Sequence, residues 1–397
     1  MSERTCQFDS DFAHEGQLAT SCLFSLNEVM KKRLVLFLCL AVAVFSSCQK
    51  ILDPLKEIVD VKTLSGFSKL YVLNEGKDGA NNASLDCLVV VDGNYQNGVY
   101  RNMNPQVGAG LGDVANDIAV YNDQVWIVVN KSGLVNVLSA KDDKEIGTVS
   151  LPTPRHIALG DGYAYVTSWN GASYASNPRG TVYKISTSTR TVAGSVEVGY
   201  QPEGVTLYNG KLYVANSGGL SAYIAPDYAY DNTVSVIDAS TMEVVETIPV
   251  QINLKYAYSD GKGSVYVTSM GNFNDIHSGL YRINVSNGNE VTKIADYVSV
   301  SSIYEDTVYY LGTEQEFDWN ATEKTWKGGA CTSGTVSPWS LPLDGMSPYG
   351  LLAIDRENFL VSDAGDYVNP GTIRLYNKGV ALWTEYTGVC PGHFAIW

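Results

Sequence analysis

The chain has 397 residues, 45% of them hydrophobic, which is enough for one large core or several smaller ones. It carries 42 acidic and 27 basic residues, a formal net charge of −15, and only four histidines. Affinity for nucleic acid depends on an excess of cationic contacts, so this composition argues against nucleic acid as a partner.

The first 47 residues are typical of an export signal. Met1–Val29 is polar and has no periodicity, and three basic residues at positions 31–33 then precede the apolar run Leu34–Phe45. A run of about 12 residues is too short to cross a bilayer and is characteristic of a secretory signal peptide.

Small residues and a cysteine end this signal. Ser46, Ser47 and Cys48 resemble the lipobox of bacterial lipoproteins, although a leucine or valine is more usual where Phe45 stands. The resemblance implies that Cys48 is lipidated, and Gln49 is similar to the residue found in lipoproteins sorted to the outer membrane. An ordinary signal peptide that ends near a cysteine is the alternative. We expect an upstream segment and signal peptide at 1–47, a lipid-anchored tether at 48–66 and one folded domain at 67–397.

A strand pattern recurs through residues 67–397. The unit around Tyr213 contains four strands, of which the first two are joined by a tight Asn209-Gly210 turn. One four-stranded sheet cannot bury both of its faces, so the copies must stack against one another. Aligned on one aromatic or aliphatic position, the copies are 55, 39, 48, 53, 43 and 51 residues apart, at Tyr71, Trp126, Tyr165, Tyr213, Tyr266, Tyr309 and Leu360.

Six of the seven copies have a readable strand ahead of the aligned position, and the first copy lacks one. The six strands are Asp117–Val120, His156–Leu159, Gly204–Leu207, Lys255–Tyr258, Ser301–Tyr304 and Tyr349–Ile354. The chain ends on CPGHFAIW, which resembles the missing strand. We therefore predict an all-β fold, a seven-bladed β-propeller closed by the C-terminal strand, which completes the first blade. A β-sandwich is the alternative, but it requires neither equal repeats nor a displaced terminal strand.

The loops differ between the two faces of the predicted ring. Short polar turns such as Asn122-Asp123 and Asp161-Gly162 form one face, and long loops, including Thr313–Ser340, form the other, where function is expected. Loop aromatics suit a large amphiphilic ligand or a partner protein, or else they pack as loop cores. They are Trp169, Tyr174, Tyr223, Tyr228, Tyr230, Phe273, Phe317, Trp319, Trp326, Trp339 and Tyr367.

Polar residues at the starts of the inner strands converge by symmetry on the mouth of the central channel. Such a mouth is the default binding site of a propeller. The alternative for each histidine is a hydrogen bond to the backbone of a neighbouring blade. The ligand-binding candidates are Asn116, Asp117, Arg155, His156, Trp169, Asn170, Glu203, Asn216, Tyr256, Tyr349 and His393.

The sequence contains little catalytic machinery. Asp117 and Glu203 offer two carboxylates, and His156 or His393 offers a base, as in propeller hydrolases. The chain nevertheless has no sialidase-type Asp box, no G-x-S-x-G elbow, no phosphate-binding glycine loop and no Cys or His pair at metal-ligand spacing. We expect a binding protein with no catalytic residue, metal or cofactor.

The cysteines limit disulfide formation. With Cys48 acylated, Cys87, Cys331 and Cys390 remain in the mature chain. Three is an odd number, so at most one disulfide forms. Cys331 and Cys390, both expected in loops, are the open possibility.

The unit LYVANSGG…NTVSVIDASTMEVVETIPV resembles the YVTN-type repeat of YncE-like propellers. With the lipoprotein signal and the closing CPGHFAIW strand, the chain is similar to exported propeller lipoproteins that capture cobalamin above a TonB-dependent outer-membrane transporter. This resemblance implies a surface lipoprotein that binds vitamin B12 or another corrinoid on one propeller face and passes it to the transporter. A glycan-binding propeller and a structural or protein-interaction scaffold are the alternatives.

Overall fold

The computed structural model describes Val61 and residues 63–171, 176–219, 229–316, 318 and 324–397. The predicted signal peptide, the predicted lipidation site Cys48 and most of the predicted tether lie outside this part of the chain. The same holds for five predicted loop aromatics, Tyr174, Tyr223, Tyr228, Phe317 and Trp319. Within the described ranges, no helix combines the length and apolar character that a membrane span requires.

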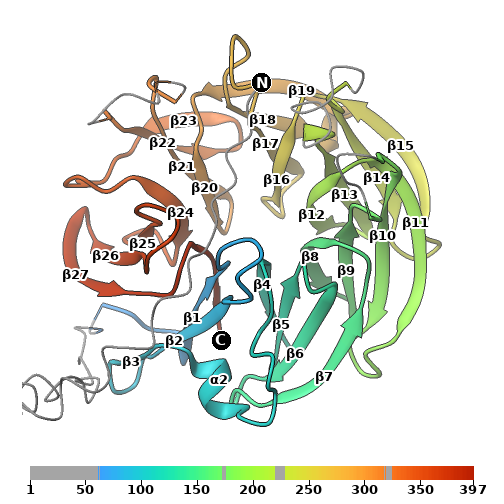
Figure 1. The fold of residues 1–397 in the computed structure, drawn as a ribbon. Coiled ribbons are helices and arrows are strands. Elements are labelled where there is room, and N and C mark those ends of the chain that lie inside the picture. The colour runs from blue at the N-terminus through green and yellow to red at the C-terminus, as the bar shows by residue number, and fades with distance from the viewer. Residues whose placement is uncertain (1–60, 62, 172–175, 220–228, 317, 319–323) are drawn as a thin grey trace, which may run out of the picture. The chain divides into compact units, whose positions relative to one another are not determined.

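Seven antiparallel sheets of four strands each surround a central axis as blades (Figure 1). From the axis outwards, blade 1 contains β28 (Pro391–Ile396), β1 (Lys69–Asn74), β2 (Ser84–Val89) and β3 (Asn94–Gln96). Blades 2 to 4 contain β4 (Ala115–Tyr121), β5 (Gln124–Val129), β6 (Leu134–Ser139) and β7 (Glu145–Ser150); β8 (Pro154–Gly160), β9 (Tyr163–Ser168), β10 (Arg179–Ser186) and β11 (Val192–Tyr200); and β12 (Pro202–Tyr208), β13 (Lys211–Asn216), β14 (Thr233–Asp238) and β15 (Glu243–Pro249).

The remaining three blades follow the same order. They contain β16 (Leu254–Ser259), β17 (Ser264–Ser269), β18 (Gly279–Asn284) and β19 (Glu290–Asp296); β20 (Val300–Tyr304), β21 (Thr307–Gly312), β22 (Lys327–Thr332) and β23 (Thr335–Pro338); and β24 (Pro348–Ala353), β25 (Asn358–Asp363), β26 (Thr372–Asn377) and β27 (Val380–Tyr386). One short helix, α2 (Val99–Met103), follows β3, and a 3-10 turn, η1 (Val285–Asn287), joins β18 to β19. The predicted seven-bladed β-propeller is confirmed.

The C-terminal strand completes the first blade, as predicted. β28 pairs antiparallel with β1, so that Tyr71 lies opposite Ala395 and Leu70 opposite Ile396. The Trp397 indole donates a hydrogen bond to Asp123 in the first turn of blade 2. Blade 1 therefore joins the two ends of the repeat array.

The predicted tight turns have the backbone conformation that their residues favour. Asn122 and Asp123 have φ angles of 48° and 59°, and Asn209 and Gly210 have 49° and 73°. Two successive residues with positive φ define a type I′ turn, whose twist matches that of a two-stranded hairpin. The first and second strands of these blades are therefore joined tightly on one face of the ring.

The prediction of one long loop at Thr313–Ser340 is wrong for its second half, where β22 and β23 form the outer strands of blade 6. The sequence KGGACT shows no strand alternation because glycines occupy positions that lie against other atoms. A Cβ on Gly329 would lie 2.4 Å from the Tyr310 hydroxyl, and one on Gly328 would lie 2.7 Å from the Tyr310 carbonyl oxygen. Glycine at both positions therefore makes room for Tyr310 of β21.

Two aromatics that we expected in this loop pack into the core instead. Trp326 and Trp339 are partly buried against a hydrophobic cluster that includes residues of blades 6 and 7. The Trp339 ring lies 5.3 Å from that of Tyr309 and 4.8 Å from that of Phe359, centroid to centroid. For these two tryptophans the packing alternative is the correct one.

The three described cysteines are buried free thiols. The disulfide that the sequence left open is therefore not formed among them. Cys331 lies in β22, opposite Val308 and Val336, so its expected position in a loop is wrong. Cys390 immediately precedes β28.

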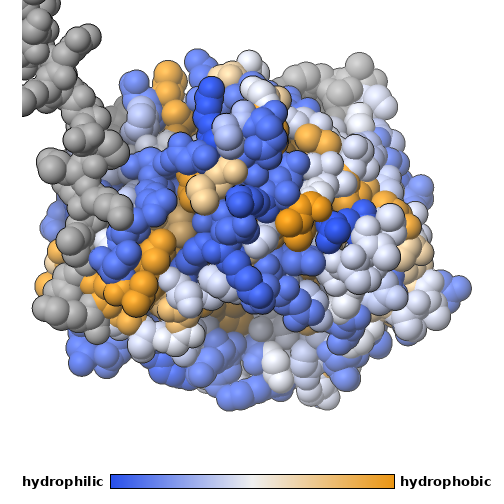
Figure 2. All heavy atoms as spheres, turned by 90° about the horizontal axis from the view of Figure 1, so that it is seen from below, coloured by the Kyte–Doolittle hydropathy of each residue, from blue (hydrophilic) through white to orange (hydrophobic). Residues whose placement is uncertain are grey.

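Neighbouring blades bury their faces against each other. Tyr71 and Leu73 of blade 1 share one cluster with Ile118 and Ile127 of blade 2. Most of the outermost strands contribute little, and in β15 only Ile248 is buried. Seen edge-on, the side of the rim that Figure 2 shows is mostly hydrophilic with scattered apolar patches. The core is thus distributed between blades, which leaves the axis free for polar groups.

Candidate functional site

The first residues of the inner strands form two rows around the axis. On β8, β12 and β16, the residues Arg155, Glu203 and Lys255 line a cavity on the long-loop face. The next residue of each strand, namely His156, Gly204 or Tyr256, lines a second cavity within the central channel. The ladders shift register at these residues, between Pro154 and Ile157, Pro202 and Val205, and Leu254 and Ala257, and one short segment in each of these three blades thereby reaches both spaces.

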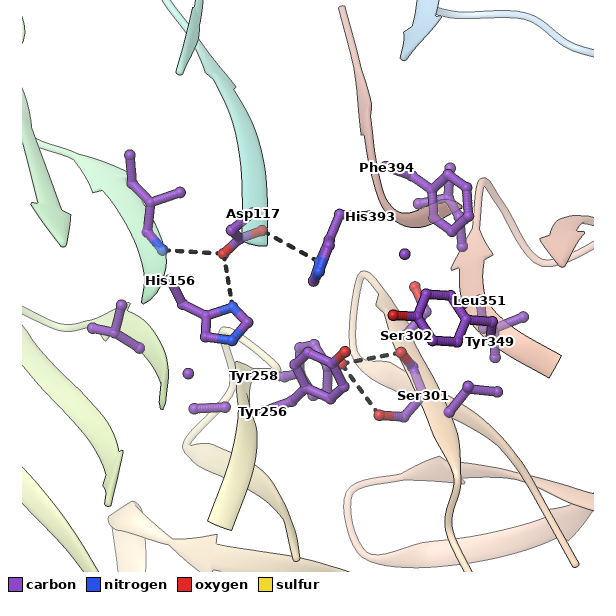
Figure 3. A pocket seen from close by; sticks show the side chains of 18 residues that line it. Asp117, His156, Tyr256, Tyr258, Ser301, Ser302, Tyr349, Leu351, His393 and Phe394 are labelled. Carbon is purple, nitrogen blue, oxygen red and sulfur yellow. Dashed lines mark hydrogen bonds and ion pairs between the residues drawn. The ribbon is translucent and has the colours of Figure 1, made fainter. Parts of the chain in front are cut away.

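The channel cavity has a volume of about 260 Å³ and is surrounded by all seven blades (Figure 3). Asp117, His156, Tyr256, Tyr349 and His393 bring their polar groups towards it. Each inner strand supplies at least one lining residue: Asp117, His156, Gly204, Tyr256, Ser301, Tyr349 and His393.

His156 lies between two carboxylates. Its Nδ1 atom is 3.1 Å from an oxygen of Asp117, and its Nε2 atom is 3.2 Å from an oxygen of Glu203. The amide of Ile157 donates to the same Asp117 oxygen at 3.0 Å. The side chains of three adjacent blades are thereby linked across the channel mouth.

Arg155 extends this network towards the loop face. Its Nε and Nη2 atoms donate to the two oxygens of Glu203 at 3.0 and 3.1 Å, a bidentate geometry. Its Nη1 atom donates to the Asn116 amide oxygen at 3.2 Å, and its guanidinium carbon lies 4.2 Å from the centroid of the Trp169 ring. The arginine therefore fixes Trp169 against one wall of the cavity by a cation–π contact.

The partners of this network set its charge. Burial alone raises the pKa of Glu203 and of Asp117, but Arg155 beside Glu203 and the hydrogen bond of His156 to Asp117 hold both pKa values below the usual range. Burial lowers the pKa of His156, but its bonds to both carboxylates outweigh burial and raise it above its ordinary value. At neutral pH the imidazole is therefore held towards its charged form between two ionised carboxylates.

His393 connects the closing strand to the same network. Its Nε2 atom lies 3.4 Å from Glu75, and its Nδ1 atom lies 3.9 Å from Asp117. Burial raises the pKa of Glu75, but the hydrogen bond and charge of His393, the charge of Lys255 and a hydrogen bond with Tyr349 together outweigh burial and lower the pKa. Burial, together with the nearby charge of Glu75, raises the pKa of Tyr349 well above its usual value. The first and last blades thus share the polar centre of the channel.

The cavity on the loop face is the larger one, about 600 Å³. Apolar side chains, Trp169, Leu254, Met270 and Phe273, form much of its wall. Polar groups are few and come from Arg155, Glu203, Ser217, Asn253 and Lys255. Mostly apolar walls with a few placed polar groups are typical of a small-molecule site.

The structure brings most of the predicted site residues together. Asn116, Asp117, Arg155, His156, Trp169, Glu203, Tyr256, Tyr349 and His393 all belong to the two cavities or to the network between them. Asn170 is exposed in the turn after β9, where its backbone N–H donates to the Ser168 hydroxyl.

Asn216 has a different role from the one expected. Its side chain is fully buried at the end of β13 and donates to Thr233 and Ser235 of the neighbouring strand at 3.0 and 2.9 Å. Asn74 occupies the same place in β1 and bonds Ser84 and Asp86. These two asparagines tie the second strand of a blade to the third, and neither lines the channel cavity or the loop-face cavity.

Sequence reasoning missed Lys255, Glu75, Ser217 and Met270. The repeat alignment contains the signal that would have found them, because Lys255 precedes Tyr256 as Arg155 precedes His156. Ser217 and Met270 likewise follow the second strand of their blades, as Trp169 and Glu75 do. Equivalent positions of a propeller face the same space.

Comparison with known structures supports the fold alone. The chain is similar to "Kuenenia stuttgartiensis Hydrazine Synthase", with 16% sequence identity and a TM-score of 0.56 over 70% of this chain and 88% of that one. It also matches "Structure of the Neurospora crassa Pan2 WD40 domain" at 13% identity and a TM-score of 0.48, over 70% of this chain and 81% of that chain. At such low identity the first match shows a common architecture and carries no activity across.

Comparison with sequence families is more informative. No curated protein matches the chain. A family model described as "Domain of unknown function (DUF5074)" matches residues 68–295, which include blades 2 to 4 and nearly all of blade 5. This match spans more than half of the 397 residues, and the chain therefore belongs to the DUF5074 family.

Proposed function

We propose that the propeller captures a bulky amphiphilic small molecule in its loop-face cavity and does not transform it. The observation that carries this proposal is the 600 Å³ cavity, in which Trp169 and Phe273 offer aromatic surface. Ligand sites commonly measure about 300–1,000 Å³ and have mainly apolar walls, so the cavity suits such a ligand.

The hydrogen bonding of His156 favours capture over catalysis. A general base needs a ring nitrogen within reach of the substrate. Both ring nitrogens of His156 already face carboxylates, Asp117 on one side and Glu203 on the other. Glu203 in turn is held by Arg155. These side chains form a satisfied network that positions the cavity wall.

A corrinoid is the ligand that we would test first. Its ring is large, nearly flat and apolar, and amide side chains surround it. The apolar wall of Trp169, Met270 and Phe273 suits the ring, and Ser217 and Asn253 offer hydrogen-bonding partners for amides. A glycan, which also stacks on aromatic rings, is the second candidate.

Calorimetric titration with cyanocobalamin, and with a panel of oligosaccharides, tests this proposal. We expect the corrinoid to bind and Trp169→Ala to weaken binding about tenfold, since the loss of one aromatic contact costs about 1–1.5 kcal/mol. Tyr386→Ala is the matched control, because Tyr386 is 75% exposed on the outer strand β27. If only an oligosaccharide gives heat of binding, the ligand is a glycan and the corrinoid assignment is wrong. If neither gives heat, the capture proposal is wrong and the scaffold alternative is favoured.

We also propose that the protein is a lipoprotein of the outer membrane that passes its ligand to a TonB-dependent transporter. The support is the Ser46-Ser47-Cys48 motif after the apolar run Leu34–Phe45. Labelled palmitate should be incorporated into the wild-type protein and the Cys22→Ser variant, and it should not be incorporated into the Cys48→Ser variant. Label retained in Cys48→Ser would contradict the anchor.

A further inference from the structure

The loop-face cavity contains a cation without a close counter-charge. Lys255 forms no ion pair within 4.0 Å in the described part of the chain, and its ammonium lies 4.7 Å from the centroid of the Tyr256 ring. Burial lowers the pKa of Lys255, but the contact with Tyr256 and the more distant charges of Glu75 and Glu203 outweigh burial and raise it. An ammonium in an apolar cavity with no carboxylate close to it is costly, so a bound anion gains affinity at this place.

The other charges of the cavity are already matched. Arg155 is bidentate to Glu203, and His156 bonds the same carboxylate. Glu75 lies close enough to Lys255 to interact electrostatically, but His393 is its nearer partner. Among the described residues, Lys255 is therefore the cation of this cavity that has no carboxylate within 4.0 Å.

We propose that the captured molecule carries an anionic group, a phosphate or a carboxylate, that binds Lys255 in the loop-face cavity. This inference rests on the proposed capture function and names one chemical feature of the ligand. An ammonium in a mostly apolar cavity attracts an anion far more strongly than the same group in water, because the surroundings screen the charge less. The apolar wall formed by Leu254, Met270 and Phe273 supplies those surroundings.

Small aromatic probes test the anion site separately from the corrinoid. Phenyl phosphate and benzoate carry the two candidate groups, and benzamide is a neutral analogue. In calorimetric titrations of the wild type we expect at least one anion to bind about tenfold more tightly than benzamide. The stronger of the two anions identifies the group.

The variants assign that preference to Lys255. Lys255→Met should abolish it, and Lys255→Arg, which keeps the charge, should retain most of it. Lys211→Met is the matched control, because Lys211 is exposed beside the tight turn on the opposite face. Melting curves equal to that of the wild type show that each variant is folded.

The outcomes separate this proposal from the proposed function. Equal affinity of the wild type for anions and benzamide, no measurable binding of either anion, or a preference that survives in Lys255→Met overturns the anion site, even where cyanocobalamin binds. A preference that depends on Lys255 upholds the anion site, even where cyanocobalamin does not bind and the corrinoid assignment fails.

Discussion

Deletion of residues 391–397 is expected to lower the free energy of unfolding by about 5 kcal/mol or more. The deletion removes β28, whose five paired positions hydrogen-bond to β1, and each backbone bond contributes about 1 kcal/mol net. All six residues of β1 are buried, so the truncation exposes apolar surface as well. A domain has only about 5–15 kcal/mol in total. Urea unfolding followed by circular dichroism measures the loss.

A rearranged chain separates the contribution of the strand from that of its position. Residues 391–397 are placed ahead of Lys69 through an Asn-Gly turn like the one at Asn209-Gly210, which keeps β28 beside β1. We expect this variant to recover most of the stability that the truncation loses. A truncated chain that melts within about 2 °C of the intact chain would contradict the role of the closing strand.

The second large effect is expected for Asp143→Ala, at about 3–5 kcal/mol of stability. Asp143 accepts two hydrogen bonds from the Lys69 ammonium, at 2.8 and 2.9 Å, and one from the Tyr71 hydroxyl at 2.7 Å. Lys69 and Asp143 are 8% and 6% exposed, so the substitution leaves a buried ammonium without its counter-charge. This pair joins β1 to the turn that precedes β7, that is, blade 1 to blade 2.

Two further variants test the cause of this effect. Asp142→Ala should cost less than about 1 kcal/mol, because the Asp142 side chain is 47% exposed and its ion pair with Lys144 is a surface pair. The double variant Lys69→Met, Asp143→Leu should recover much of the loss, since it removes both buried charges together. Urea unfolding of the four proteins gives the comparison. A cost below about 1 kcal/mol for Asp143→Ala alone would show that the buried pair does not hold the two blades.

The fold could be predicted because each blade repeats short local signals. The Asn209-Gly210 turn needs two positive φ angles, which this pair adopts readily, and the aligned position of each second strand is aromatic or aliphatic. The closing strand could be found by counting, since one blade lacked its inner strand. These signals depend on residues that are close in sequence, and such patterns survive without coordinates.

The outer strands of blade 6 could not be predicted in this way. Gly328 and Gly329 lie where Tyr310 of the adjacent strand needs the space, and the strand pattern is therefore lost from the local sequence. The site was predictable in part for a similar reason. Symmetry placed Arg155, His156 and Glu203 at the mouth. It did not show which groups form ion pairs and which, like Lys255, have no carboxylate close by, because ion pairing depends on distances between blades.

The pairing of Tyr71 with Ala395 has a consequence for biosynthesis. These residues form one ladder, yet more than three hundred positions of the chain separate them. Contacts of such long range slow folding, because a long loop must close before they form. The first blade to leave the ribosome is therefore the last to be finished, and the inner edge of β1 stays unpaired until residue 396 has been made.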